Sequence, residues 1–562
     1  MSAHRQTTLE GSALVPTKST EVMTGGEALV RSLLSYSVDT VFGIPGNHLY
    51  DFYDALHKAG SSVRVVTTRH EQGAGYMAFG YAQSTGKVGV CAVVPGAGLL
   101  NTTAALLAAY GCNAKVLCVT GQIPSAGIGK GIGYTHELPE QLAMIRSVTK
   151  WSARIERPAQ APEMVSRAFR ELHTGRPRPV LLEMAIDVMA MECPVELQDP
   201  VASTPSLSCD PDVIERAAKL LGEARSPLIL VGGGAIEAAE ELRALAEMLQ
   251  APVVAHRQGR GVLSATHYLS QCYPAGHKLW ADADVVVAVG TRLKYPLLYW
   301  GTNGLKIIRV DIDATEIDRV ESPAVSIVAD ARRTLADLIP AVERHNVPRR
   351  SRQDEMEALK SEMQHEFREL EPQMSFLRVI REELPDDGIF VDDITQVGFA
   401  SWFAFPVYRP RQFISSGYQG TLGHGFATAL GVCIAHPHKK VIQVSGDGGF
   451  MYNVQELSTA VQNNLGIVAI VFRDNRFGNI YRDQKNRNGR RLIGCDLHNP
   501  DFVALAESFG AAGFRASTPE QLRQAIRRSF DCGGPAVIEV SVGEMPSPWR
   551  FIMMPRVRPS TH

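Results

Sequence analysis

Residues 445–478, SGDGGFMYNVQELSTAVQNNLGIVAIVFRDNRFG, are the stretch that decides the fold. The apolar run VIQV just before it and the run IVAIVF inside it predict two buried strands with a helical segment between them. A polar turn follows each strand: Gly446-Asp447-Gly448 follows the first and Arg473-Asp474-Asn475 the second. This order predicts a parallel α/β sheet with both turns at its carboxyl edge, where such sheets bind ligands.

The residue types in the two turns suit a metal-bound diphosphate. Glycines allow backbone amides to approach a diphosphate, and Asp447 and Asp474 return to the same edge of the sheet. Carboxylate oxygens are good ligands for a hard divalent cation. A GDG turn alone is more often an ordinary glycine-rich turn with an acidic residue, so the second acidic turn is what favours a metal site.

The stretch resembles the cofactor motif of thiamine diphosphate enzymes, which begins with GDG and usually ends in two asparagines. Here Asp474 takes the place of the second asparagine, and an aspartate remains a good magnesium ligand. The resemblance implies that Mg²⁺ is bound by Asp447, by the side chain of Asp474 and by the backbone carbonyl of Arg476. It implies a larger set of cofactor-binding residues: Glu71, Thr395, Gln396, Gly420, Leu422, Gly446, Asp447, Gly448, Gly449, Asp474, Arg476, Phe477 and Gly478.

Glu71 lies in RHEQGA, where a small-residue helix is expected to begin. An acid in a first helical turn usually does no more than favour the helix dipole. The resemblance gives Glu71 a catalytic role: it bonds N1′ of the aminopyrimidine and favours the tautomer whose 4′ nitrogen takes the proton from C2. It also implies that Leu422 wedges between the two cofactor rings, that the Gly420 carbonyl accepts from the 4′-amino group, and that the turn at Thr395 and Gln396 touches the diphosphate.

Candidate substrate-pocket residues come from three loops. Asn47 and His48 follow a short expected strand, residues 40–43, while His136 and Glu137 follow a glycine-rich loop. In relatives a glutamine near this second loop faces the substrate. A one-residue shift in register between relatives leaves either His136 or Glu137 in its place. Asn479 and Ile480 begin a helix that lines the pocket in relatives. Glu71, His48 and His136 are therefore the catalytic candidates.

The alternation of helices and strands predicts three Rossmann-like, doubly wound α/β domains with parallel sheets. We expect a flexible arm over residues 1–21, a pyrimidine-binding domain over 22–190, a central domain over 206–345, a diphosphate- and Mg²⁺-binding domain over 370–545 and a tail over 546–562. A faint repeat relates EQGAGYMAFGYAQSTGKVGVCAVVPGAGLLN to QGTLGHGFATALGVCIAHPHKKVIQVSGDGGFMYN. It predicts that the first and last domains share one fold.

The central domain carries weak signs of nucleotide binding. Its first strand ends in three glycines, residues 232–234, and Asp311 has the position of a ribose-binding acid. The residues after Gly290-Thr291-Arg292 lack the acids and arginine of acetolactate synthases, which weakens the case for FAD. We therefore expect neither FAD nor a nucleotide in this domain.

Composition excludes several classes of protein. With 57 basic and 59 acidic residues the net charge is −2, which predicts neither a nucleic-acid partner nor a membrane surface. The nine cysteines are scattered and include no Cys-x-x-Cys pair, as expected for buried thiols in a reducing compartment. The first twenty residues lack the apolar core of a signal peptide, and no apolar run reaches the roughly 18 residues that span a bilayer. We expect a cytoplasmic protein.

The resemblance covers about residues 22 to 545. It implies cleavage or formation of C–C bonds in 2-oxo acids, aldehydes or 2-hydroxy ketones, as in acetolactate synthase-like carboligases and decarboxylases. His48 also fits a benzaldehyde lyase-like protein, and His267 a benzoylformate decarboxylase-like one. Two other classes stay open, a non-catalytic cofactor-binding homologue and a nucleotide-dependent oxidoreductase. Because the family builds its site from two subunits, the resemblance implies at least a homodimer, and we expect a tetramer.

Overall fold

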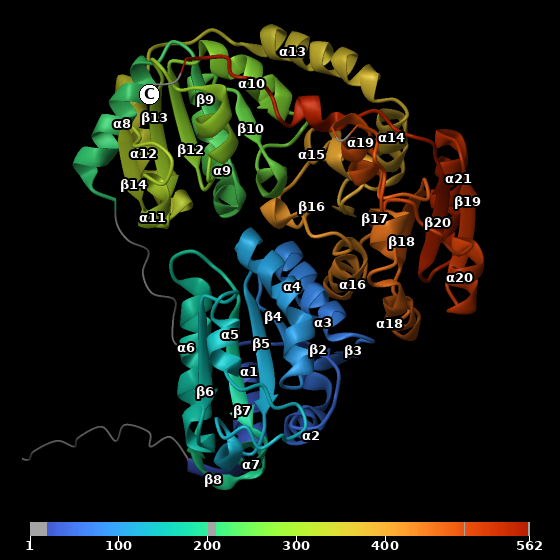
Figure 1. Cartoon of the computed structure of the whole chain (residues 1–562). Helices are drawn as coiled ribbons and strands as arrows, with labels where there is room; N and C mark the ends of the chain where they lie inside the picture. The colour runs from blue at the N-terminus through green and yellow to red at the C-terminus, as the bar shows by residue number, and fades with distance from the viewer. Residues whose placement is uncertain (1–19, 201–208, 488, 560–562) are drawn as a thin grey trace, which may run out of the picture.

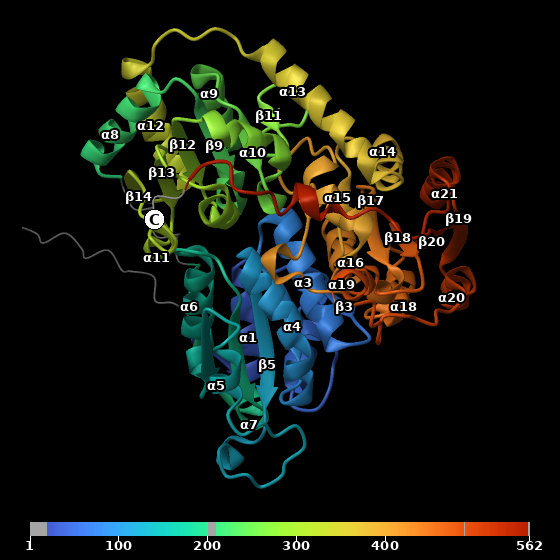
Figure 2. The same ribbon diagram turned by 45° about the horizontal axis from the view of Figure 1, so that its top comes forward.

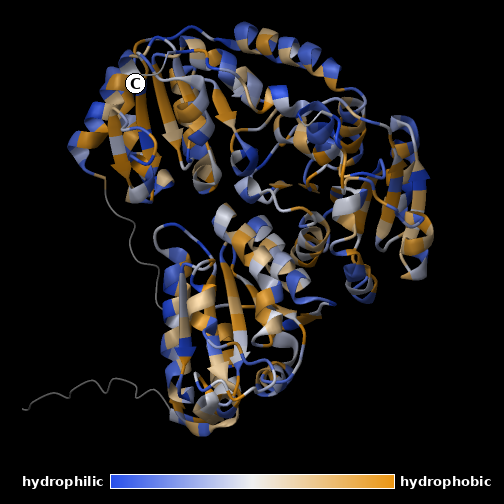
Figure 3. Cartoon of the chain, in the orientation of Figure 1, coloured by the Kyte–Doolittle hydropathy of each residue, from blue (hydrophilic) through white to orange (hydrophobic). Residues whose placement is uncertain are grey.

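The computed structural model describes residues 20–200, 209–487 and 489–559. It contains three six-stranded parallel sheets, each flanked by helices, and this confirms the predicted fold class (Figure 1). The strands carry mostly apolar residues, because both faces of each sheet are covered (Figure 3). Within the described residues no helix is long and apolar enough to cross a membrane.

The first domain has the strand order β3-β2-β4-β5-β7-β6. Its strands are β2 (Thr40–Gly43), β3 (Arg64–Thr67), β4 (Gly89–Val93), β5 (Val116–Gln122), β6 (Trp151–Ile155) and β7 (Val180–Ala185). Its helices are α1 (Gly25–Ser35), α2 (Tyr50–Lys58), α3 (Glu71–Thr85), α4 (Ala97–Cys112), α5 (Gln141–Ile145), α6 (Ala161–His173) and α7 (Ile186–Ala190).

The last domain has the order β16-β15-β17-β18-β20-β19. Its strands are β15 (Ile389–Val391), β16 (Phe413–Ile414), β17 (Val441–Gly446), β18 (Ile467–Arg473), β19 (Ala512–Ala516) and β20 (Ala536–Ser541). Its helices are α14 (Gln373–Glu383), α15 (Gln396–Ala404), α16 (Gly425–Ala435), α17 (Asp447–Phe450), α18 (Leu457–Gln462), α19 (Gly478–Arg487), α20 (Phe502–Ser508) and α21 (Pro519–Asp531). Counted along the chain, both domains show the same strand order, which confirms that they share one fold.

The central domain has the order β11-β10-β9-β12-β13-β14, which is that of a dinucleotide-binding Rossmann sheet. Its strands are β9 (Pro227–Val231), β10 (Val253–Ala255), β11 (Ser270–Gln271), β12 (Val285–Val289), β13 (Lys306–Asp311) and β14 (Val325–Val328). Its helices are α8 (Pro211–Glu223), α9 (Ala239–Leu249), α10 (Tyr273–Asp282), α11 (Ala314–Ile317) and α12 (Ala331–His345). A connecting helix, α13 (Gln353–Glu366), runs from this domain to the last one (Figure 2).

The edges of the first domain differ from the expectation in one respect. Strand β1 (Thr20–Thr24) pairs antiparallel with β8 (Glu192–Glu196), which lies beyond the expected domain end at residue 190. The expected arm lies outside the described residues except for Thr20 and Glu21, which belong to β1. The two strands lie at opposite ends of the domain's sequence. The pattern of neighbouring residues therefore did not reveal their pairing.

The two small-residue helices of the repeat, α3 and α16, pack against each other and join the first domain to the last. Their backbones touch at two glycines. A Cβ atom on Gly80 would lie 2.0 Å from the carbonyl oxygen of Thr428, and one on Gly431 would lie 2.0 Å from that of Met77. Only a residue without a side chain allows this approach.

A buried ion cluster joins the first domain to the central one. The guanidinium of Arg176 lies 2.8 Å from Glu316, 3.1 Å from Asp311 and 3.6 Å from Asp313. The charged groups of Arg176, Asp311 and Glu316 are all largely buried, so each relies on the others for compensation.

We predict that Gly80→Ala destabilises the protein although alanine is the better helix former. The propensity gain is roughly 1 kcal/mol. A methyl group 2.0 Å from the Thr428 carbonyl oxygen forces the two helices apart, and overpacking typically costs about 1–3 kcal/mol or more. The melting temperature should fall by about 5 °C in a scan at fixed rate. Gly466→Ala is the control, because a Cβ there meets nothing within 4 Å; an equal change in both variants would contradict the close-contact argument.

Candidate active site

Asp447 begins α17 immediately after β17 and is almost fully buried, at 1% exposure. Its Oδ1 accepts a hydrogen bond from the backbone N–H of Gly448 (2.8 Å). Its Oδ2 accepts from the backbone N–H of Asn475 (2.7 Å) and from the side-chain amide of Asn499 (2.8 Å). The carboxylate therefore ties the turn after β17 to the turn after β18, and both turns lie at one edge of the sheet as predicted.

Asp474 lies beside Asp447 in the second turn. Burial first, and then the charge of Asp447, raise the pKa of Asp474 to about 6. Burial also raises the pKa of Asp447. Two desolvated carboxylates that disfavour each other's charge fit a divalent cation, which would compensate both.

Two carboxylates are too few to surround a cation, so they suit a cation that a bound ligand also helps to coordinate. Among the described residues, no group of three or more His, Cys, Asp or Glu side chains is arranged to hold a metal ion. Two carboxylates would therefore be completed by other oxygens, such as a backbone carbonyl and phosphate oxygens, which are the ligands that Mg²⁺ takes when it binds together with a phosphorylated molecule. The residues present fit the predicted metal and cofactor.

The remaining predicted cofactor residues of the last domain gather around these two acids. A Cβ on Gly448 would lie 2.6 Å from the ring of Phe477, so glycine is required for the close approach of the two turns. A Cβ on Gly446 would lie 3.5 Å from the hydroxyl of Thr395. The first turn thus also borders the start of α15, and Gly478, whose Cβ would lie 2.8 Å from Asp474, closes the second turn.

The loop that carries Gly420 and Leu422 lies against the same cluster. Gly420 has a left-handed backbone, with φ +57°, and a Cβ on Gly449 would lie 3.1 Å from Leu422. The buried carboxylate of Asp393 accepts from the backbone N–H groups of Gly423 and Gly425, both at 3.0 Å. Asp393 therefore fixes the backbone immediately after Leu422.

Helix α19 meets both the turn of Thr395 and Gln396 and the tail. Arg482 donates to the side-chain oxygen of Gln396 (3.0 Å) and to the carbonyl of Met545 (2.6 Å). Asn479 accepts from the indole N–H of Trp549 in the tail (2.7 Å), while Ile480 is half exposed. The tail thus packs on the helix that carries predicted pocket residues.

In the first domain, the structure brings together two histidines from distant loops. The rings of His48 and His136 lie 5.6 Å apart, centroid to centroid, in an edge-to-face arrangement. Both residues have a left-handed backbone, with φ +72° and +64°, and both Nδ1 atoms are buried without a hydrogen-bond partner among the described residues. Burial first, and then the neighbouring His136, lower the pKa of His48, so its imidazole is neutral at pH 7.

The two other candidates from these loops bond to nearby backbone. The carboxylate of Glu137 accepts from the N–H groups of Gly133 (2.6 Å) and Tyr134 (3.0 Å), which closes the glycine-rich loop on itself. Its other oxygen, Oε1, is buried without a partner among the described residues. Asn47 is exposed and accepts from the N–H of His48 (3.1 Å).

Glu71 is the first residue of α3, and its carboxylate accepts from the side-chain amide of Asn101 (3.0 Å). The loop before it is held by Glu456, a fully buried residue of the last domain. Glu456 accepts from the N–H groups of Arg69 (3.1 Å) and His70 (3.0 Å) and from the hydroxyl of Thr459 (2.6 Å). Sequence reasoning missed Glu456 although it lies in the decisive stretch, because a single acid in a helical segment carries no local signal.

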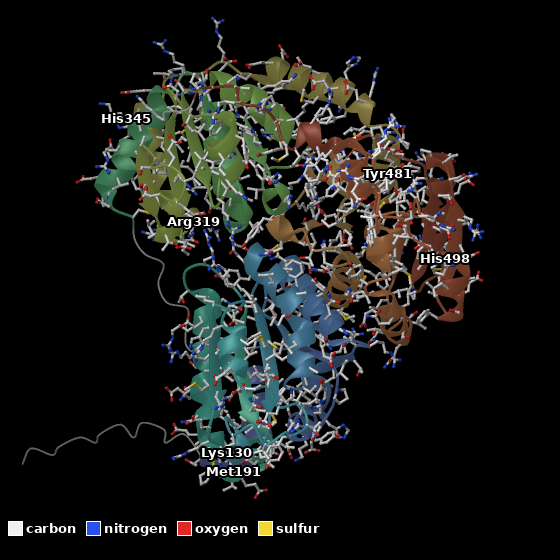
Figure 4. All side chains as sticks on the ribbon, viewed as in Figure 1. Lys130, Met191, Arg319, His345, Tyr481 and His498 are labelled. Atoms are coloured by element: carbon white, nitrogen blue, oxygen red, sulfur yellow. The ribbon has the colours of Figure 1, made fainter. Side chains whose placement is uncertain are left out.

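The candidate residues come from the first and the last domain. In Figure 4, Lys130 of the glycine-rich loop marks the free end of the first domain, whereas Tyr481 on α19 lies on the last domain. The hydrogen bonds and ion pairs of the described residues link neither Glu71 nor His48 directly to the acidic turns. The loop before Glu71 nevertheless contacts the last domain of the same chain through Glu456.

The central domain uses its nucleotide-like residues for packing. Asp311 is bound by Arg176, and a Cβ on Gly234 would lie 2.7 Å from Gly290, so these glycines let two turns touch. His267 pairs with Glu247 on α9 (Nε2 to Oε1 3.1 Å). These contacts agree with the expectation that no nucleotide binds here, which stays a prediction.

Family models for thiamine pyrophosphate enzymes match the chain in three places. The N-terminal TPP binding domain matches residues 23–144, the central domain residues 214–338 and the C-terminal TPP binding domain residues 393–540.

Curated relatives match over nearly the whole chain. A probable 2-ketoarginine decarboxylase of Pseudomonas aeruginosa is 35% identical, covering 94% of this chain and 95% of its own. A probable acetolactate synthase large subunit of Methanococcus aeolicus is 32% identical, covering 92% of each chain. The acetolactate synthase isozyme 1 large subunit of Escherichia coli is 30% identical, covering 94% and 95%.

We predict that Glu456→Ala lowers the melting temperature, because it removes the acceptor of two part-buried N–H groups and of the buried Thr459 hydroxyl. A buried donor left unsatisfied costs about 1–3 kcal/mol, and the two part-buried donors should cost less. Glu456→Gln keeps one oxygen for the N–H groups of Arg69 and His70 and should recover part of the loss. Glu507→Ala, an exposed acid of α20, is the control and should change the melting temperature little. Equal melting temperatures for Glu456→Ala and the control would contradict the assigned positioning role.

Proposed function

Because the chain belongs to the thiamine pyrophosphate enzyme family, we propose that it uses thiamine diphosphate and Mg²⁺ to act on the C–C bond beside the carbonyl of a 2-oxo acid. The observation that carries the proposal is the meeting of Asp447 and Asp474 beside the turn of Thr395 and the loop of Leu422. When bound, the cofactor supplies a carbon nucleophile and a sink for the electrons of the broken bond.

The residues of the last domain bind and orient the cofactor in this proposal. Asp447, Asp474 and the carbonyl of Arg476 hold Mg²⁺, and the backbone amides of the first turn face the diphosphate. Leu422 separates the two rings, since Asp393 and the contact with Gly449 fix its loop.

The first domain supplies the proton chemistry. Glu71 holds a proton at N1′ of the aminopyrimidine, and its position is set by Asn101 and by the loop that Glu456 anchors. The neutral imidazole of His48, next to His136, exchanges a proton with the substrate oxygen on which negative charge develops. Asn47, Asn479 and Ile480 complete the pocket, with Glu137 behind the loop of His136.

Two chains are needed to complete this site. No hydrogen bond or ion pair of the described residues links Glu71 directly to the acidic turns, and we propose that each active centre takes Glu71 and the histidines from one subunit and the metal turns from another, as the family builds its site. A homodimer is the minimum, and a tetramer would hold two such pairs. The nine cysteines are all free, which favours the cytoplasm as the location.

The substrate we propose is a small 2-oxo acid. The similar proteins from Pseudomonas aeruginosa and Escherichia coli are named as a decarboxylase and a synthase, so the fate of the product carbon distinguishes the two activities. Release as an aldehyde makes a decarboxylase, whereas addition to a second carbonyl makes a carboligase.

The direct test of the proposed function is turnover by protein stripped with EDTA and then reconstituted. We expect CO₂ release from at least one of pyruvate, 5-guanidino-2-oxopentanoate and benzoylformate, only when thiamine diphosphate and Mg²⁺ are both restored. Chromatography of the products separates aldehydes from 2-hydroxy ketones. Tight cofactor binding without turnover of any of these acids would favour the non-catalytic homologue, and no cofactor binding would refute the proposal.

The shared site is tested by mixing two inactive chains. Glu71→Gln should still bind the cofactor but lose C2 proton exchange, measured by NMR in deuterium oxide. Asp447→Ala should lose Mg²⁺ and diphosphate binding together, measured by calorimetry. Co-expressed chains should regain about a quarter of the wild-type activity, because half of the oligomeric pairs are mixed and each mixed pair has one intact site.

Mixing after separate purification, without subunit exchange, is the control and should restore nothing. If co-expression also restores nothing while mixed oligomers are present, each site lies within one chain.

A further inference from the structure

A cavity lies where the central domain meets the last domain, away from the acidic turns. It has a volume of about 880 Å³, within the range of sites for small molecules. Its walls come from the residues around β11 and from α13 and α14. Residues 403–408, at the carboxyl end of α15 and just after it, complete the walls. In Figure 2, α13 crosses from the central domain to the last domain above α14.

The charge of the wall is predominantly positive. Five basic side chains line the cavity, but only two acidic ones. Arg260 donates to the carbonyls of Ser401 and Phe405, and Lys360 to those of Ala265 (3.0 Å) and His267 (2.7 Å), so neither is available to a ligand.

Two arginines at the opening keep exposed side chains. Arg368 makes no ion pair with any described residue, and Arg378 makes one long hydrogen bond, to the hydroxyl of Ser375 (3.3 Å). Of the two acids, Glu382 is already paired with Arg523. The other, Glu371, accepts from the N–H of Ser375 (3.0 Å). The two arginines outnumber this one remaining acid, so an anionic group at the opening would meet an excess of positive charge.

Three buried polar atoms of the wall have no hydrogen-bond partner among the described residues. They are Oε1 of Gln271, the hydroxyl of Tyr273 and Nε of Arg381. All three side chains are more than nine-tenths buried. Each of these atoms has almost no surface open to solvent, so they belong to the buried backing of the wall and are not contacts for a molecule in the cavity.

The rest of the wall is apolar and aromatic. Phe367, Phe403, Phe405 and Tyr408 contribute rings, and Met363, Met374 and Leu377 contribute flexible aliphatic groups. Such a surface binds the body of an organic molecule, whereas a free inorganic anion would leave it wet.

We propose that this cavity is a binding site for an organic anion with an apolar or aromatic body. The acidic group lies at Arg368 and Arg378, and the body lies among the phenylalanines. The wall includes the carboxyl end of α15, whose first residue, Gln396, is bound to Arg482 of α19. A bound molecule would therefore contact the same helix that begins at the diphosphate turn.

The test uses 8-anilinonaphthalene-1-sulfonate as the anionic probe and the uncharged N-phenyl-1-naphthylamine as its counterpart. Full-length protein is titrated with each, with and without thiamine diphosphate and Mg²⁺. We expect saturable binding of the sulfonate that cofactor does not displace. Arg378→Glu should weaken the sulfonate about tenfold at low salt and less at high salt, and leave the neutral probe unchanged.

Two further variants make the test specific. Gln364→Trp places a large ring at an exposed position of the wall and should weaken both probes, whereas Arg216→Glu, the same charge change on exposed α8, should weaken neither. Circular dichroism checks that each variant is folded. The proposal is overturned if the cofactor displaces the sulfonate, if Gln364→Trp has no effect, or if Arg216→Glu acts as strongly as Arg378→Glu.

Discussion

The architecture depends on the direct backbone contact between α3 and α16. Gly80 and Gly431 let each helix reach the other's carbonyl oxygens. The two helices, and with them the first and last domains, therefore pack more closely than any side chain at these positions would allow. Glu456 then reaches across to the backbone just before Glu71. Together these contacts hold α3 and the loop before it against the last domain of the same chain.

Burial of charge shapes the site within this frame. Asp447 and Asp474 are desolvated side by side, and both pKa values rise. Backbone N–H groups and Asn499 satisfy their oxygens in part, and the remaining deficit of positive charge is what favours the proposed cation at this edge of the sheet. In the first domain, desolvation acts in the opposite sense, since it keeps His48 neutral and able to exchange a proton.

The central domain shows how one fold serves different purposes. Its strand order is that of a dinucleotide-binding sheet, yet Asp311 binds Arg176 of the first domain and the glycines after β9 pack on Gly290. A fold alone does not establish a function. The basic, aromatic cavity beside β11 lies at the boundary with the last domain, next to a hydrophobic cluster that both domains share.

The sequence by itself determined those features that short segments encode. Apolar runs and glycine-rich turns predicted the strands and the two acidic turns, because a turn that binds phosphate needs small residues in consecutive positions. The small-residue helices and the duplication could also be recognised, because each is encoded in consecutive residues. The tertiary structure alone decided which distant groups meet: His48 with His136, Asn499 with Asp447, Glu456 with the loop of Glu71, and β1 with β8. These pairs depend on strand order and on the packing of α3 on α16, and such long-range geometry leaves no mark on the residues next to each group.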